Sequence, residues 1–249
     1  MIQLLHNAYG MMRDYARRHR ALYALVRVLK FGPFLGWRDE RIRARLIAEA
    51  RENGWCMLNL GSGGRYERQM INLDVTPITG PDVVGDGYAL PFAAGTFRLV
   101  ICDYVIEHVP DPDRFLRTLG AVLHGDGVAY LEVPFLQPRH GSPNDYTRWT
   151  QEGFRLLAER AGFEVRVAAI HAGSACTVFW ILKEWIAVLA GVGIPPIVAV
   201  LRYLLSWILC PLLILDVILP PVFRSDTLAS GYYFVLAPRR PNVLRDVAA

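Results

Sequence analysis

A turn of small residues follows a short apolar run in "LNLGSGG", residues 58–64. Glycine permits a tight turn and lets backbone N–H groups approach a ligand closely. Asp74 ends the next short apolar run and Asp86 follows a third, so each carboxylate stands just past a predicted strand. Such carboxylates can accept hydrogen bonds from a ribose diol and an adenine amino group. The turn alone also fits an ordinary surface loop, but the ordered series favours a bound nucleoside.

A second group of chemically capable side chains lies in "VPFLQPRHGSPNDYTRWTQEG", residues 133–153. His140, Asp145, Tyr146 and Arg148 fall within ten residues there. Imidazole titrates near neutral pH, so His140 is the candidate general base for a hydroxyl substrate, and Asp145 could orient it or the substrate. In the alternative interpretation, Asp145 and Arg148 form an ion pair that braces the loop, and His140 is only a hydrogen-bonding loop residue.

The four cysteines show neither metal-ligand nor redox spacing. We therefore expect reduced thiols, a cytosolic compartment and no metal at the site. The first residues lack a long apolar core and a small-residue cleavage site, so no signal peptide is expected. Residues 1–51 hold eleven Lys or Arg and four Asp or Glu, although the whole chain has a net charge of only +4. This basic, helix-rich segment suits an anionic surface, or simply a solvated helical face.

Short β-rich runs alternate with helical runs through the middle of the chain, which predicts a parallel sheet with helices on both faces. Asp111 with Pro112 starts one helix, and Thr150 caps another. We expect three regions: a basic helical N-terminal segment at 1–53, an α/β domain at 54–173 and 227–249, and a hydrophobic insert at 174–226. The predicted strands are "CMLNL", "INLD", "DVV", "FRLVIC", "GVAYLEV", "FEVRVAAI" and "GYYFVLAP".

The chain resembles the class I S-adenosylmethionine-dependent methyltransferases, in particular the type 11-like branch with an "LPF…FD…EH" pattern. The resemblance rests on "LNLGSGG", "INLD", "GDGYALPFAAGTFRLVICDYVIEHV", "FLRTLGAVLHGDGVAYLEVP" and "AERAGFEV", in this order. It implies a Rossmann-like seven-strand sheet whose last two strands pair antiparallel. Asn59 stands where the family often has an acid, and the gap from Gly64 to Asp74 is too short for the usual helix. That shortened form, with the pattern around His140, resembles a subgroup associated with bacterial surface-glycan pathways.

The resemblance also implies roles for individual residues. The turn would lie under the methionine part of S-adenosylmethionine, Asp74 would hold the ribose hydroxyls, and Asp86 with Gly87 would hold the adenine edge. Asp103 and Tyr104 would line the methionine side. The cofactor-binding candidates are Gly61, Ser62, Gly63, Asp74, Asp86, Gly87, Asp103 and Tyr104, the catalytic candidates are His140 and Asp145, and the substrate-binding candidates are His108, Tyr146 and Arg148.

The insert explains why 53% of the residues are hydrophobic and why the mean hydropathy is +0.25. Residues 175–190 carry Lys183 and Glu184 near their middle, which disfavours a full membrane span. Residues 197–219 are more apolar, and "GVGIPP" separates the two stretches. Because both flanking strands belong to one sheet, the insert must leave and return on the same side. This parity predicts a hairpin that dips into one leaflet; a buried helical cap or a dimer interface is the alternative.

Together these features predict a membrane-associated methyltransferase on the cytoplasmic face of the inner membrane. Its partners would be a lipid surface and a glycan or lipid-linked acceptor, methylated at oxygen. The alternatives are a methyltransferase of a lipid headgroup or quinone, and a non-catalytic relative that uses the insert for interactions. No nucleic-acid partner is expected, because the basic residues lie away from residues 133–153, the acceptor loop, and no aromatic-basic motif accompanies them.

Overall fold

The computed structural model of the protein describes residues 39–63, 65–77, 80–141, 144–218 and 225–239. Most of the basic N-terminal segment therefore lies outside the described residues, including its predicted first helix. The second predicted helix is present as α3 (Arg41–Glu52), which ends at the Asn-Gly pair that the sequence offers as a stop signal.

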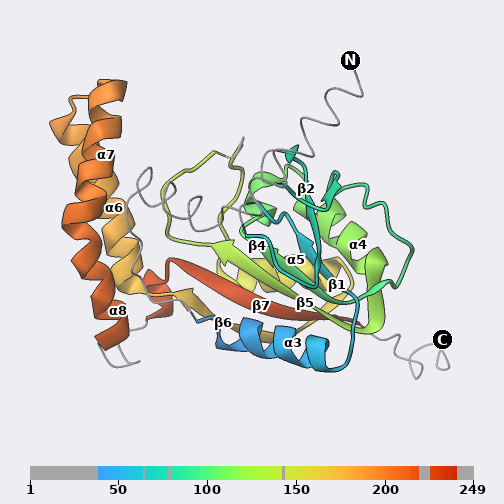
Figure 1. The fold of residues 1–249 in the computed structure, drawn as a ribbon. Coiled ribbons are helices and arrows are strands. Elements are labelled where there is room, and N and C mark those ends of the chain that lie inside the picture. The colour runs from blue at the N-terminus through green and yellow to red at the C-terminus, as the bar shows by residue number, and fades with distance from the viewer. Residues whose placement is uncertain (1–38, 64, 78–79, 142–143, 219–224, 240–249) are drawn as a thin grey trace, which may run out of the picture.

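A seven-stranded sheet, in the order β3-β2-β1-β4-β5-β7-β6, forms the centre of the molecule (Figure 1). Its first five strands pair in parallel, and β7 runs antiparallel to both of its neighbours, β5 and β6. The predicted Rossmann-like methyltransferase fold is thereby confirmed. The strands are β1 (Met57–Leu60), β2 (Ile71–Asp74), β3 (Val83–Val84), β4 (Phe97–Asp103), β5 (Leu123–Pro134), β6 (Phe163–Ala172) and β7 (Gly231–Pro238).

Two helices, α4 (Pro112–Val122) and α5 (Gln151–Arg160), cover one face of the sheet, and α3 packs on the other. The predicted caps are both confirmed. The Asp111 carboxylate accepts a hydrogen bond from the Arg114 N–H at 3.0 Å, and the Thr150 hydroxyl accepts one from the Gly153 N–H at 3.0 Å.

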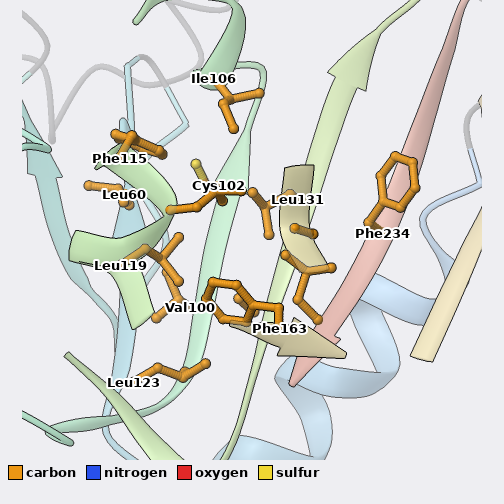
Figure 2. Close-up of a cluster of buried hydrophobic side chains, with 14 of the residues drawn as sticks. Leu60, Val100, Cys102, Ile106, Phe115, Leu119, Leu123, Leu131, Phe163 and Phe234 are labelled. Carbon is orange, nitrogen blue, oxygen red and sulfur yellow. The ribbon is translucent and has the colours of Figure 1, made fainter. Parts of the chain in front are cut away.

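The larger hydrophobic core lies between the sheet and helices α4 and α5, and Figure 2 shows its centre. Leu119 and Phe115 of α4 meet Val100 of β4 and Leu131 of β5, all of them at most 1% exposed. Burying this apolar surface, at about 25 cal/mol per Å², holds the strand ends that carry the predicted site residues.

No helix separates β1 from β2 in the described residues 65–70, as the short gap predicts. The chain makes one turn there and enters β2 directly. A buried amide network ties this connection down: Asn59 donates to the Arg65 carbonyl at 2.6 Å and to the Asn72 side chain at 2.9 Å. Asn59, which replaces an acid common in similar domains, therefore fixes the turn.

The insert forms a helical hairpin at one end of the sheet (Figure 1). Helix α6 (Ser174–Ala190) is followed by a turn, α7 (Pro195–Leu209), the 3₁₀ segment Cys210–Ile214 and α8 (Leu215–Ile218). The predicted break at "GVGIPP" coincides with the turn between α6 and α7.

The four charged side chains of the hairpin all have partners within it. Glu184 and Arg202 form an ion pair at 2.7 Å between α6 and α7. The Lys183 ammonium lies 3.8 Å from the centre of the Trp180 ring. Asp216 is buried and accepts hydrogen bonds from the Ala175 and Cys176 N–H groups, both at 2.9 Å, so it caps the first turn of α6.

One continuous helical stretch, Pro195–Ile218, is apolar and long enough to cross a membrane, with a mean hydropathy of 2.2 in its best window. Length and composition alone are weak support for a span, because core helices of soluble proteins share them. Such core helices are mostly buried, however, whereas only 17% of this window is buried.

Candidate active site

The glycine turn after β1 is held by backbone geometry that only glycine accepts. Gly61 has a φ of +70°, and a Cβ there would lie 2.3 Å from the Val105 side chain. Its N–H donates to the Leu73 carbonyl at 2.8 Å, which draws the turn against the end of β2. Gly63 has a φ of +47°, and its N–H donates to the Asp74 carboxylate at 2.7 Å. The turn and the predicted ribose-binding acid are thus one hydrogen-bonded unit.

A cavity of about 930 Å³ opens above the carboxyl ends of β1, β2 and β4. This edge of a parallel sheet is where α/β folds bind their ligands. All eight residues predicted to bind the cofactor line this one cavity, although the first and last of them are 43 positions apart in the chain: Gly61, Ser62, Gly63, Asp74, Asp86, Gly87, Asp103 and Tyr104.

The donors and acceptors of this cavity fit S-adenosylmethionine. A Cβ at Gly63 would meet no side chain and would reach into the open cavity, so glycine keeps the backbone accessible there. Asp74 at the end of β2 and Asp86 just after β3 supply carboxylates to the cavity. One buried oxygen of Asp103, Oδ1, has no hydrogen-bond partner among the described residues. It is an acceptor available to a cationic group such as the amino group of a methionine moiety.

The other oxygen of Asp103 is held by two arginines. Arg43 from α3 donates to Oδ2 at 3.1 Å, and Arg65 from the short β1–β2 connection donates at 3.0 Å. Burial raises the pKa of the Asp103 carboxyl above its ordinary value, and the two guanidinium groups oppose that shift. Neither arginine can be recognised as a site residue from the sequence, because charge alone does not reveal which basic residues face inward.

A second, smaller cavity of about 280 Å³ adjoins the cofactor cavity, and Tyr104 lines both of them. His140, the predicted general base, lines this cavity. One wall comes from helix α6 of the insert, through Cys176, Trp180 and Glu184. The sequence analysis did not place any insert residue at the site, since no motif marks these three positions. We refer to this space as the acceptor cavity.

The acceptor loop contains the ion pair of the alternative interpretation. Arg148 holds Asp145 with both amino groups of its guanidinium, the Nη2–Oδ2 distance being 2.6 Å. Asp145 also accepts from the His140 backbone N–H at 2.7 Å. The Arg148 guanidinium lowers the pKa of the Asp145 carboxyl to about 2. Asp145 therefore shapes the loop around His140, whose Nδ1 lies 3.9 Å from its carboxylate.

The predicted substrate-binding residues separate into two places. His108 lines the cofactor cavity, whereas Tyr146 and Arg148, together with Asp145, line a distinct depression of about 270 Å³. Tyr146 is half exposed, and its N–H donates to the Glu107 carbonyl at 2.8 Å. The loop is thereby fastened to the short 3₁₀ turn that follows β4, Ile106–His108.

Two histidines converge on one buried acid between the cavities. Glu107 is completely buried, and its Oε1 lies 3.7 Å from His108 Nε2 and 3.6 Å from His140 Nε2. The two imidazole rings stand nearly perpendicular, with their centres 5.3 Å apart. The Glu107 carboxylate raises the pKa of the His140 imidazole, and burial opposes that shift. The sequence analysis noted Glu107 only as part of a motif.

Comparison with known proteins supports the assignment of the cofactor cavity. Residues 65–131 match the family model described as "Methyltransferase domain". The matched segment contains Asp74, Asp86, Asp103 and Glu107, and it ends before the acceptor loop begins. A search among curated proteins finds no match.

Solved structures with this fold include the [4+2]-cyclase SpnF, at 13% identity and a TM-score of 0.51, with 91% of this chain and 96% of that chain covered. They also include phosphoethanolamine N-methyltransferase 2 of Haemonchus contortus, in complex with phosphomonomethylethanolamine and S-adenosylhomocysteine. It has 13% identity and a TM-score of 0.51, and the likeness covers 92% of this chain but only 61% of that one. At such low identity, these structures show the fold alone, and one fold serves different reactions.

The matched family model indicates the activity, and the glycine–carboxylate cavity on this fold suits the cofactor that such an activity needs. The finer subgroup suggested by the acceptor loop is not part of that match, which stops at residue 131. Residues 65–131 match a methyltransferase domain, and the protein is an enzyme that uses S-adenosylmethionine.

Proposed function

We propose that the enzyme methylates an oxygen of a glycan or lipid-linked acceptor at a membrane surface, on the cytoplasmic face of the inner membrane. The observation that carries this proposal is the position of α6. The same helix lines the acceptor cavity with Cys176, Trp180 and Glu184 and belongs to an insert with a strongly apolar outer surface. Binding of the insert to lipid would bring the acceptor cavity to the same surface.

The distribution of exposed apolar side chains supports the lipid contact. In the described part of the chain, 16 of the 21 large hydrophobic side chains that are exposed lie between Val178 and Ile218. An apolar surface of this kind marks an interaction site or a membrane contact. The Glu184–Arg202 pair and the Lys183–Trp180 contact lower the cost of placing the charges of the hairpin in an apolar medium.

The strand topology favours a hairpin over a single span. Strands β6 and β7 are neighbours in the sheet, so the insert begins and ends on the same side of any membrane. Helix α6 has 17 residues, which corresponds to a length of about 25 Å, less than the thickness of a hydrocarbon core. We therefore favour a hairpin that enters one leaflet and returns.

Methyl transfer to a hydroxyl requires the protein to position the acceptor and to remove the hydroxyl proton. S-adenosylmethionine supplies a methyl group on a positively charged sulfur. Residues of the acceptor cavity hold the hydroxyl next to Tyr104, where the two cavities meet. The hydroxyl proton leaves at the cluster of Glu107, His108 and His140, of which His140 lines the acceptor cavity. Asp145 and Arg148 position His140 through its backbone.

Mass analysis of envelope glycans and lipids tests the proposal directly. A strain that lacks the gene should lose a species 14 mass units heavier than its unmethylated counterpart, and the wild-type gene should restore it. A strain that carries Asp74→Ala should resemble the deletion if the product depends on cofactor binding. Loss of a methylated headgroup or quinone instead would reassign the acceptor. No change in any envelope component would contradict the proposed function.

A further inference from the structure

The buried Glu107 carboxylate lacks the hydrogen bonds that such a group ordinarily requires. Both of its oxygens are buried and have no hydrogen-bond partner among the described residues. A buried carboxylate in this condition costs several kcal/mol unless a cation is close to it. The neighbours of Oε1 are the Nε2 atoms of His108 and His140, at 3.7 and 3.6 Å. These distances are longer than hydrogen bonds.

Hydrogen bonds at the far side of each ring decide which nitrogen carries a proton. His108 Nδ1 lies 2.6 Å from the Asn144 carbonyl oxygen, and His140 Nδ1 lies 3.2 Å from the Pro138 carbonyl oxygen. A carbonyl can only accept, so these two contacts place the hydrogen on Nδ1 of each ring. The Arg148 guanidinium, which can only donate, lies 3.4 Å from His140 Nδ1, and a hydrogen on that nitrogen excludes a hydrogen bond between the two. In the neutral rings the Nε2 lone pairs then point at Glu107. Backbone partners of this kind commonly orient histidines that ligate metals.

The three ligand atoms also have the spacing of a metal site. One ring nitrogen of each histidine and one Glu107 oxygen all lie within 4.8 Å of one another. In a tetrahedral site with bonds of about 2.1 Å, neighbouring ligand atoms are about 3.4 Å apart. The two measured acid–histidine distances exceed that value by only a few tenths of an ångström. The separation of the two histidine nitrogens is bounded only at 4.8 Å, so the imidazoles would have to approach each other by up to about 1.4 Å to bond the same ion.

We propose that Glu107, His108 and His140 bind a divalent first-row metal ion, of which Zn²⁺ is the reference case. Two imidazoles and one carboxylate suit such ions better than Mg²⁺, which prefers carboxylates and water. Three protein ligands leave a coordination position open, as in catalytic zinc sites. The assignment replaces the expectation of a metal-free site, which rested on cysteine spacing and did not consider histidines 32 positions apart.

The position of the ion would connect the two cavities. His108 lines the cofactor cavity and His140 lines the acceptor cavity, so the open position faces the region where they meet. An acceptor hydroxyl bound there has a lowered pKa and releases its proton to water at neutral pH. His140 then serves as a ligand and not as the base. This role, unlike metal binding itself, rests on the proposed function.

Metal binding can be measured without any methyl transfer. The full-length protein, prepared without a histidine tag and stripped with a chelator, is titrated with Zn²⁺ by calorimetry, and retained metal is counted after dialysis. We expect one tight equivalent and an increase in thermal stability. His140→Ala and His108→Ala should each weaken binding at least tenfold. Mg²⁺ in large excess should not compete.

Matched controls separate this site from other possible ligands. His124→Ala removes a histidine outside the cluster, and Cys56→Ser removes an exposed thiol; both variants should still bind one equivalent. Glu107→Gln should also weaken binding, but its side chain is completely buried, so the exposed His140 gives the more decisive variant. Binding of S-adenosylhomocysteine by each variant confirms that it is folded.

Failure of the metal site and failure of the proposed function give different results. The absence of any binding at 100 µM Zn²⁺, or unchanged affinity in both cluster variants, would overturn the metal site whatever the acceptor is. One tight equivalent that depends on His108 and His140 would support it even if no methylated envelope component were found.

Discussion

Leu119 in α4 is completely buried against the sheet, whereas Leu204 in α7, on a helix of similar length, is 47% exposed. Charged residues show the opposite contrast. In α4 the Asp113–Arg117 pair lies on the solvent-facing surface, whereas in the hairpin Lys183 and Asp216 are buried. Helix α4 turns its apolar side chains inward and its charges outward, whereas the hairpin exposes many large apolar side chains and buries two of its four charges. A chain folded only for water gains nothing from such an exposed apolar surface, so the comparison supports the proposed contact of the insert with an apolar partner.

The largest expected effect of removing the insert is on the partition of the protein between membrane and soluble fractions. The intact enzyme should stay with membranes in high salt and leave only with detergent, because buried apolar contacts are not screened by ions. A version with residues 175–222 replaced by a short Gly/Ser linker should become soluble or extractable by salt. Fractionation and immunoblotting provide the measurement. If the intact protein is soluble and monomeric without detergent, the hairpin is a packed cap and the comparison fails.

A matched pair of leucine variants tests the contrast in packing. Leu119→Ala should lower the free energy of unfolding by about 2–5 kcal/mol, because it leaves a cavity in the core. Leu204→Ala should change it by less than about 0.5 kcal/mol in detergent, because that side chain is half exposed. Urea unfolding followed by tryptophan fluorescence gives both values. Equal costs would mean that the outer face of α7 is buried in an oligomer.

Cofactor binding should depend on the α/β domain alone. Asp74→Ala should weaken binding of S-adenosylhomocysteine by about 1–3 kcal/mol, through lost charged hydrogen bonds to the ligand and to the Gly63 N–H. Asp113→Ala, which removes an exposed acid of α4, serves as the control and should leave affinity unchanged. Calorimetry measures both. Unaltered affinity in Asp74→Ala would remove the ribose-binding role from that carboxylate.

The smallest expected effect is on the stability of the junction between the α/β domain and the insert. Asp216→Ala removes the cap of α6 and should cost about 0.5–2 kcal/mol. Hydrogen exchange should accelerate at the Ala175 and Cys176 amides, which donate to this carboxylate. Asp226→Ala, an exposed acid beyond the hairpin, is the control. Uniform protection in both variants would show that the α6 terminus is held by packing and not by Asp216.

Local signals were sufficient to predict much of the α/β domain. Gly61 has a positive φ, which favours glycine, and Asp111 caps a helix by bonding to a residue three positions later. Both features depend on nearby residues, so the sequence alone indicates them. Contacts between distant elements leave no such mark. In the sequence Asp216 is only a charge within an apolar segment, whereas in the structure it caps a helix that begins about 40 positions earlier. The wall that α6 adds to the acceptor cavity and the approach of His140 to Glu107 likewise arise only from the tertiary fold.

Strand β7 is the last strand in the chain, yet it lies between β5 and β6 in the sheet. Pro134 pairs with Gly231, and β6 has no strand neighbour other than β7 among the described residues. At about 5–20 residues per second, the ribosome delivers the hairpin on the order of seconds before β7 can close the sheet. On the proposed surface attachment, the hairpin reaches lipid while the sheet is still open. On the same proposal, the enzyme completes its fold at the surface where it works.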